Sequence, residues 1–133
     1  MKDVDPKRSA LMARVRTKNT KPELIVRQTT YALGYRYRLH RRDLQGSPDL
    51  VFSRQKKAIF VHGCFWHRHH GCRRTTIPKI RAEFWRAKFE ANVDRDARNI
   101  SALRAAGWHV LVVWECETTD VVSLRAKLQC FLS

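Results

Sequence analysis

The chain has 133 residues, of which 44% are hydrophobic and 29% charged, so it can bury the core of one ordinary domain and is neither disordered nor fibrous in composition. Lysines and arginines number 27 against 12 acidic residues, and because solubility alone does not require a net charge of +15, this excess indicates a nucleic-acid partner. The sequence has no apolar run long enough to cross a bilayer, no signal-peptide core near its N-terminus and no basic amphipathic anchor, so we expect a cytoplasmic, nucleoid-associated protein with no membrane partner.

Two helices are expected in the first quarter of the chain. Residues 6–17 have the pattern of a short basic helix. A second helix should begin at Thr20, since Thr20 and Glu23 have the spacing of a capping box around Pro22. It should end near residue 33, because Gly34 can adopt the left-handed conformation that closes a helix.

Strands are expected next. Residues 35–40 alternate between aromatic or apolar and basic side chains, which predicts a half-buried strand. Residues 49–52 and 58–61 are two apolar segments joined by a short polar turn, which predicts a hairpin. Residues 108–114 are almost wholly apolar, so we expect a central strand that is buried on both faces.

Two further helices complete the expected order. Apolar residues recur at helical spacing over residues 82–106, and a last helix is predicted over 120–131. Helices and strands alternate without a linker or a repeat, so residues 1–133 should form one domain. The expected class is α/β, with a central mixed sheet flanked by helices.

The loop after the hairpin predicts a metal site. Without a secretion signal, the four cysteines are not expected to form structural disulfides. Cys64 and Cys72 enclose three histidines within nine residues, and thiolates and imidazoles are the ligands that Zn²⁺ prefers in sets of four. Cys116, directly after the apolar strand, is the natural further ligand, and Cys130 is the reserve candidate.

One histidine would complete this set. His69 is our choice, His70 is the next candidate, and His67 is kept for catalysis. Three cysteines and one histidine would leave no open position, so the zinc would be structural. The alternative is that the cysteines are plain buried thiols. Because two cysteines enclose three histidines, the sequence favours zinc over this alternative.

Candidate catalytic residues surround the same loop. Pro48-Asp49 stands at the start of a strand and could offer Mg²⁺ a hard oxygen ligand, although an ordinary turn has the same pattern. His62 and His67 could each move a proton near neutral pH, and a hydrogen-bonded histidine at a strand end is the alternative for His62. Asp96 could orient such a histidine or form a surface salt bridge.

Aromatic residues near this loop suggest contacts with bases. Phe65 and Trp66 lie between expected zinc ligands, where a rigid loop suits stacking or wedging between base pairs. Trp85, near the start of the long helix, could do the same or belong to the core.

Taken together, these features resemble the very-short-patch (Vsr) mismatch-repair endonucleases over nearly the whole chain. The string over residues 61–67, followed by Glu-Phe-Trp at residues 83–85, is the most specific part. The other matching segments are residues 8–12, 18–23, 48–49, 92–96 and 113–116.

The resemblance implies a restriction-endonuclease-like fold and a magnesium-dependent DNA endonuclease. Members of the family act beside cytosine-5 methyltransferases. Deamination of 5-methylcytosine leaves thymine opposite guanine, and the enzyme nicks the strand 5′ to that thymine, which initiates very-short-patch repair. The implied partner is double-stranded DNA with a T:G mismatch; repair partner proteins can take part but are not named by the sequence.

The resemblance also implies roles for single residues. Asp49 and the Val61 carbonyl would bind Mg²⁺, and His67 would be the general base. The supporting residues around them would be His62, Asp96 and Glu23. Phe65, Trp66 and Trp85 would enter DNA, and Cys64, His69, Cys72 and Cys116 would bind Zn²⁺. The wider nuclease superfamily has a lysine near His62, so a histidine mechanism must replace it.

Two other functions compete with this one. A non-catalytic, zinc-stabilised nucleic-acid-binding module would explain the charge and the zinc loop but not the acidic and histidine residues. A restriction or homing nuclease would be a dimer that cuts both strands of matched DNA. One set of active-site residues with no duplicate favours a monomer that nicks one strand.

Overall fold

The computed structural model describes residues 19–133, and the helix expected over residues 6–17 lies outside them. The regular elements run in the order α2 (Lys21–Ala32), β1 (Arg38–Leu39), β2 (Leu50–Phe52), the short helix η1 (Ser53–Gln55), β3 (Lys57–His62), α3 (Ala82–Ala105), β4 (His109–Trp114), the short helix η2 (Glu115–Thr119) and α4 (Val121–Leu132).

Four strands form one mixed sheet in the order β1-β2-β3-β4. β2 and β3 are the expected hairpin, paired antiparallel with Leu50 opposite Ile59. β1 pairs antiparallel with β2, and β4 pairs parallel with β3, after the crossover through α3. A parallel pair needs such a long connection, and the 24-residue helix α3 supplies it.

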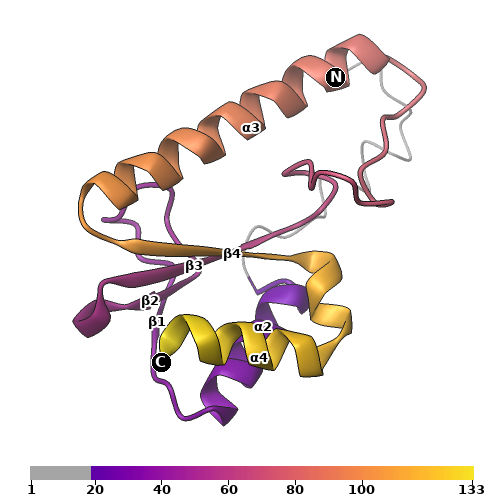
Figure 1. Ribbon diagram of the computed structural model, residues 1–133. Coiled ribbons are helices and arrows are strands. Elements are labelled where there is room, and N and C mark those ends of the chain that lie inside the picture. The colour runs from indigo at the N-terminus through magenta and orange to yellow at the C-terminus, as the bar shows by residue number, and fades with distance from the viewer. Residues whose placement is uncertain (1–18) are drawn as a thin grey trace.

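The sheet lies between helices. Figure 1 shows α3 across one side of the sheet and α2 and α4 together on the other. The main core fills the space between the sheet and the α2–α4 pair; its buried residues are Val26, Leu50, Phe52, Ile59, Val113, Leu124, Leu128 and Leu132. A second, smaller cluster around Trp85 and Phe89 joins the start of α3 to the loop after β3.

The helix ends follow the sequence signals. The Thr20 hydroxyl accepts a hydrogen bond from the Glu23 N–H, and Gly34 follows α2 with a φ of 96°. The Asp120 carboxylate accepts from the Ser123 N–H at the start of α4. These caps place Glu23, one residue after Pro22, in the first turn of α2, and that turn faces the sheet.

Two expected strands differ from the structure. β4 is an edge strand of the described sheet and not its centre, and only its Val113 is fully buried. A long apolar run indicates a strand whose two faces are covered, but it does not require a neighbouring strand on each side. The apolar pattern therefore could not distinguish a central strand from an edge strand. β1 covers only two of the six residues expected, and it ends where His40 leaves the extended conformation with a φ of 49°.

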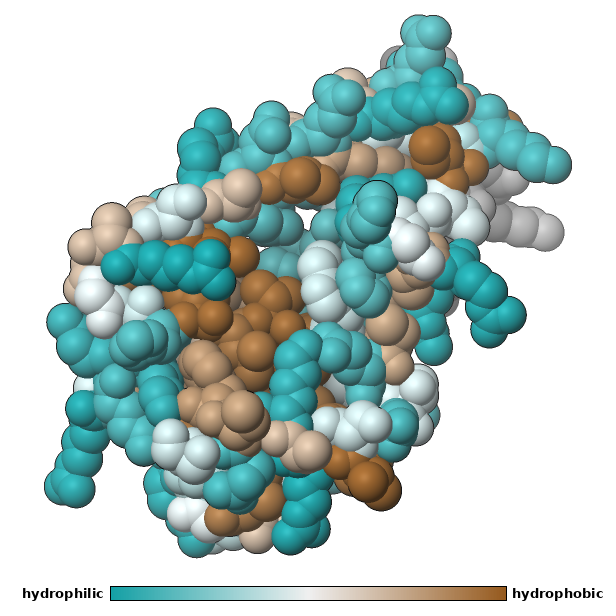
Figure 2. Space-filling model, viewed as in Figure 1, coloured by the Kyte–Doolittle hydropathy of each residue, from teal (hydrophilic) through white to brown (hydrophobic). Residues whose placement is uncertain are grey.

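The surface over α3 is strongly hydrophilic. Figure 2 shows hydrophilic side chains along most of α3 on the viewed face. Its exposed basic residues are Arg86, Lys88, Arg95, Arg98 and Arg104. Within residues 19–133, no helix combines the length and the apolar character that a membrane span requires.

Candidate active site and metal centre

A cavity of about 1120 Å³ lies between the start of α2, the segment before β2, the end of β3 and the second half of α3. All five predicted catalytic residues line it, together with one residue that was not predicted: Glu23, His40, Asp49, His62, His67 and Asp96. Val61, Phe65 and Trp66 line it too. The side chains fall into two groups of three, one around Asp49 and one around His67, and within each group the ligand atoms lie within 4.8 Å of one another.

The first group contains two carboxylates and a histidine. Glu23 is 1% exposed, and its Oε2 lies 2.9 Å from Nε2 of His40 and 3.4 Å from a guanidinium nitrogen of Arg27. The Asp49 carboxylate accepts a hydrogen bond of 2.7 Å from the backbone N–H of Val61. This contact ties the start of β2 to the end of β3, where the cavity opens.

The surroundings of Asp49 oppose its negative charge. Burial is the main reason that the pKa of Asp49 rises to about 6, and the nearby Glu23 charge adds to the rise. The hydrogen bond from Val61 and the His40 side chain act in the opposite direction. Two carboxylates held this closely in a partly buried site favour a bound cation, and their hard oxygen atoms fit Mg²⁺.

The second group contains a histidine pair and one carboxylate. Nδ1 of His67 lies 2.5 Å from Oδ2 of Asp96, and the ring of His67 stacks on that of His62 with centroids 3.9 Å apart. Because a carboxylate only accepts hydrogen bonds, Nδ1 of His67 carries the proton. Its Nε2 is then the basic nitrogen, as a general base requires.

Two side chains of this group, His62 and Asp96, differ in their charge near neutral pH. Burial, and then the neighbouring His67, lower the pKa of His62 to about 3, so His62 is neutral near pH 7. Burial alone would raise the pKa of Asp96, but the hydrogen bond from His67 and the nearby positive charges lower it overall. The carboxylate therefore stays ionised and can stabilise a protonated His67.

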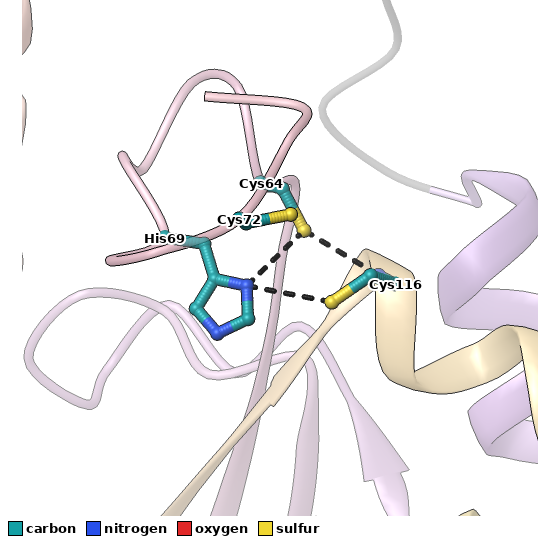
Figure 3. A group of neighbouring side chains, drawn as sticks. All are labelled: Cys64, His69, Cys72 and Cys116. Carbon is teal, nitrogen blue, oxygen red and sulfur yellow. Dashed lines mark hydrogen bonds between the residues drawn. The ribbon is translucent and has the colours of Figure 1, made fainter. Parts of the chain in front are cut away.

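The predicted zinc ligands also meet. Figure 3 shows Cys64, His69 and Cys72 from the loop after β3 and Cys116 from η2 gathered around one point. Nδ1 of His69 lies 3.6 Å from Sγ of Cys64 and 3.4 Å from Sγ of Cys116. Three sulfurs and one imidazole nitrogen within ligand range of each other are a donor set that fits Zn²⁺.

The other candidate ligands lie outside this cluster. His70 is exposed, and Cys130 is exposed on α4. Burial raises the pKa of the Cys64 thiol to about 12, so this thiol remains protonated unless a cation replaces its proton.

The aromatic residues predicted to contact DNA are packed against one another. Trp85 is 1% exposed, and its ring lies 6.3 Å from that of Trp66 and 5.9 Å from that of Phe89. Phe65 and Trp66 are half-buried and line the cavity. In this conformation Trp85 is a core residue, as its helical spacing allowed, and entry of the three aromatic side chains into DNA stays a prediction.

His40 was not among the predicted site residues, because its position depends on how two strands pair. β1 and β2 pair antiparallel with Leu39 opposite Leu50, and the next pair along the chains is His40 and Asp49. The backbone N–H of His40 indeed donates to the Asp49 carbonyl at 3.1 Å. The sequence predicts a strand over residues 35–40 but does not predict which strand pairs with it.

Comparisons with known proteins agree on one family. The sequence model described as DNA mismatch endonuclease Vsr matches residues 2–74. The type II nicking enzyme V.XorIIP of Xanthomonas oryzae is 52% identical over 126 residues, which cover 95% of this chain and 92% of the relative. The type II nicking enzyme V.NmeAIP of Neisseria meningitidis is 41% identical over 92% of this chain and 86% of its own length.

A further relative carries the family name itself. The DNA mismatch endonuclease Vsr of Escherichia coli is 42% identical over 118 residues, which cover 87% of this chain and 75% of the relative. A family match over more than half of the chain and several relatives at this identity agree with the resemblance found in the sequence. The chain belongs to the Vsr family of DNA mismatch endonucleases.

Proposed function

We propose that the protein is a Mg²⁺-dependent endonuclease that nicks duplex DNA 5′ to the thymine of a T:G mismatch left by deamination of 5-methylcytosine, and so initiates very-short-patch repair. One observation carries the proposal. A single cavity brings the carboxylate pair of Glu23 and Asp49 together with the hydrogen-bonded His67 and Asp96. Both parts are needed for hydrolysis of a phosphodiester: cation binding and proton transfer.

We further infer that the fold is restriction-endonuclease-like. The family supports this inference, and so does the position of the candidate site on the β2–β3 hairpin of a mixed sheet flanked by helices. Asp49 stands at the start of one hairpin strand, and Val61 and His62 stand at the end of the other.

The chain's own residues supply a consistent set of roles. Asp49 and the Val61 carbonyl would hold Mg²⁺, with Glu23 beside them. When bound, the ion would offset charge on the phosphate oxygens and make a coordinated water more acidic. His67 accepts the proton of the attacking water, and Asp96 fixes the tautomer of His67 and stabilises its charged form. His62 supports the His67 ring by stacking.

The cysteine cluster would bind a structural Zn²⁺. Cys64, His69, Cys72 and Cys116 fill a tetrahedral set without an open position. His67 lies between two of these ligands in the chain, so the ion would fix the loop that carries the general base. This arrangement gives zinc an effect on catalysis without contact with substrate.

Recognition of the mismatch would depend on the aromatic residues. A mismatch weakens stacking locally, so separating neighbouring base pairs costs least there. Phe65 and Trp66 line the cavity and are only half-buried, whereas Trp85 would have to leave the aromatic cluster. We expect Phe65 and Trp66 to make the first contacts. One cavity of this kind in the described chain suits a monomer that nicks one strand.

A covalently closed plasmid with one T:G mismatch tests the activity. The protein with Mg²⁺ should convert it to the open circular form and leave the matched plasmid closed. EDTA and Asp49→Ala should abolish the conversion, whereas Asp94→Ala, which removes an exposed carboxylate outside the cavity, should not. Binding without cleavage would favour a zinc-stabilised binding module, and linear product from matched DNA would favour a restriction-type enzyme.

A further inference from the structure

His40 makes two contacts that join the two carboxylate-bearing segments of the site. Its side-chain Nε2 lies 2.9 Å from Oε2 of Glu23, on α2. Its backbone N–H donates to the carbonyl of Asp49, next to β2, at 3.1 Å. The histidine side chain is 16% exposed and the Glu23 side chain 2% exposed, so the contact is shielded from water.

The Glu23 carboxylate needs such a partner. It is buried and shares the site with a second carboxylate, on Asp49, so repulsion would drive the two apart. A hydrogen bond from each side opposes this movement: the Asn19 N–H donates to Oε1 at 3.2 Å, and His40 lies against Oε2. Arg27 also reaches Oε2, but at 3.4 Å and from a more exposed position.

The conformation of His40 suits this position. Its φ of 49° ends β1 and turns the chain at the point where the side chain meets Glu23. The backbone and the side chain of one residue thus fix the distance between α2 and β2. Mg²⁺ prefers oxygen to nitrogen ligands, and a histidine that donates to a ligating carboxylate is a common outer partner at metal sites.

We propose that His40 is a positioning residue of the divalent-cation site: its Nε2–H holds the Glu23 carboxylate beside Asp49, so that both acidic side chains face one ion. This inference deepens the proposed function and rests on it for the identity of the site. The histidine acts through Glu23 and is not itself the ligand.

Binding of Mn²⁺ to the zinc-loaded protein, followed by electron paramagnetic resonance, measures the site without DNA. The signal lost in Asp49→Ala defines the ion bound at this site. His40→Ala should weaken that binding about tenfold, and His40→Gln, whose amide can still donate to Glu23, should stay within about threefold of the wild type. His109→Ala, which removes an exposed histidine on β4, is the matched control and should change nothing.

Nicking as a function of Mg²⁺ concentration gives a second readout. The half-saturating Mg²⁺ concentration should rise about tenfold in His40→Ala, while the rate at saturating Mg²⁺ falls much less. In a Glu23→Gln background, His40→Ala should have no further effect on Mn²⁺ binding, because the carboxylate that it positions is gone. Should His40→Ala fail to fold, His40→Leu is similar in volume, lacks a donor and should show the same loss.

Several results would overturn the proposal. One is unchanged Mn²⁺ binding in His40→Ala. Another is a loss in His40→Gln as large as in His40→Ala, which would make the histidine itself a ligand. The third is a wild-type protein without Asp49-dependent Mn²⁺ binding. A wild-type protein that binds Mn²⁺ at this site but nicks no DNA would instead defeat the proposed function, and the binding comparison would still decide the role of His40.

Discussion

Asp49 lies between the buried Glu23 carboxylate and the backbone N–H of Val61. The surroundings that suit it to hold a cation also make its ionised form unfavourable when no cation is present. Burial likewise disfavours the charged form of His62, so this histidine is neutral beside His67. At the scale of single residues, the ionisable groups of the site are therefore suited to a state in which a cation and a phosphate are bound.

Removal of the Asp49 charge should stabilise the metal-free protein. Because the folded pKa of about 6 exceeds the ordinary 3.8, the folded state binds the proton more tightly; this stabilisation is complete below about pH 4 and lost as the pH rises through 6. Asp49→Asn avoids that loss and should be more stable than the wild type above pH 6, by on the order of 3 kcal/mol. Urea denaturation from pH 4 to 8 without Mg²⁺ measures the difference, and a difference independent of pH would refute this explanation.

The contact between His67 and Asp96 should affect the rate more than binding. Asp96→Asn can retain a hydrogen bond but no longer fixes the tautomer or stabilises the charged imidazole, so single-turnover nicking should slow by about 100-fold or more. DNA affinity, measured without Mg²⁺, should stay within about twofold. A rate within threefold of the wild type would exclude the assigned role of Asp96, which is to fix the tautomer and stabilise the charge of His67.

At the scale of elements, the loop after β3 carries both kinds of site. It contributes Cys64, His69 and Cys72 to the metal cluster and His67 to the cavity. The ring of Trp114, at the end of β4, stacks on His69 at 4.3 Å and meets His62 edge-on at 5.3 Å. Ring contacts therefore join the Cys–His cluster to the two histidines of the cavity.

Loss of one ligand should loosen this loop. Cys116→Ser should lower the bound zinc well below one ion per chain and reduce the melting temperature by about 5 °C or more, since an ion that binds only the folded state stabilises it. Cys130→Ser is the matched control, because Cys130 is exposed on α4 and lies outside the cluster. Metal analysis and calorimetry measure both. Equal zinc content in the two variants would contradict the assigned ligand set.

At the scale of the whole molecule, the sequence carries a net charge of +15, and the cavity has basic residues of its own. Arg42 and Arg95 are exposed and line the cavity from the loop before β2 and from α3. Within residues 19–133, neither side chain forms a salt bridge or a hydrogen bond. Both can therefore bind backbone phosphates beside the site.

These phosphate contacts predict a salt dependence. Replacement of Arg42 and Arg95 by alanine should reduce the slope of log affinity against log salt by about 2, because each cation displaces about one counterion from DNA. Arg125→Ala removes an exposed arginine from α4, on the other side of the sheet, and should leave the slope nearly unchanged. Fluorescence anisotropy across a salt series decides this, and equal slopes in both variants would place the DNA elsewhere.

Local signals in the sequence predicted the parts of the molecule that depend on local structure. The helix caps, the β2–β3 hairpin and the ligand-rich loop follow from turn residues, alternation and spacing within short segments. His40 depends on the register between β1 and β2, which no short segment contains. The edge position of β4 likewise depends on the order of the strands in the sheet, which an apolar pattern within one strand does not reveal.

Mapping of the cut at nucleotide resolution tests the central claim most directly. Synthetic duplexes that carry T:G or the matched C:G pair would be labelled on one strand at a time and incubated with the protein and Mg²⁺ across several flanking sequences. We predict one cut, immediately 5′ to the mismatched thymine, with the guanine strand and the matched duplex intact. Cuts in both strands, or equal cutting of matched and mismatched DNA, would contradict the account.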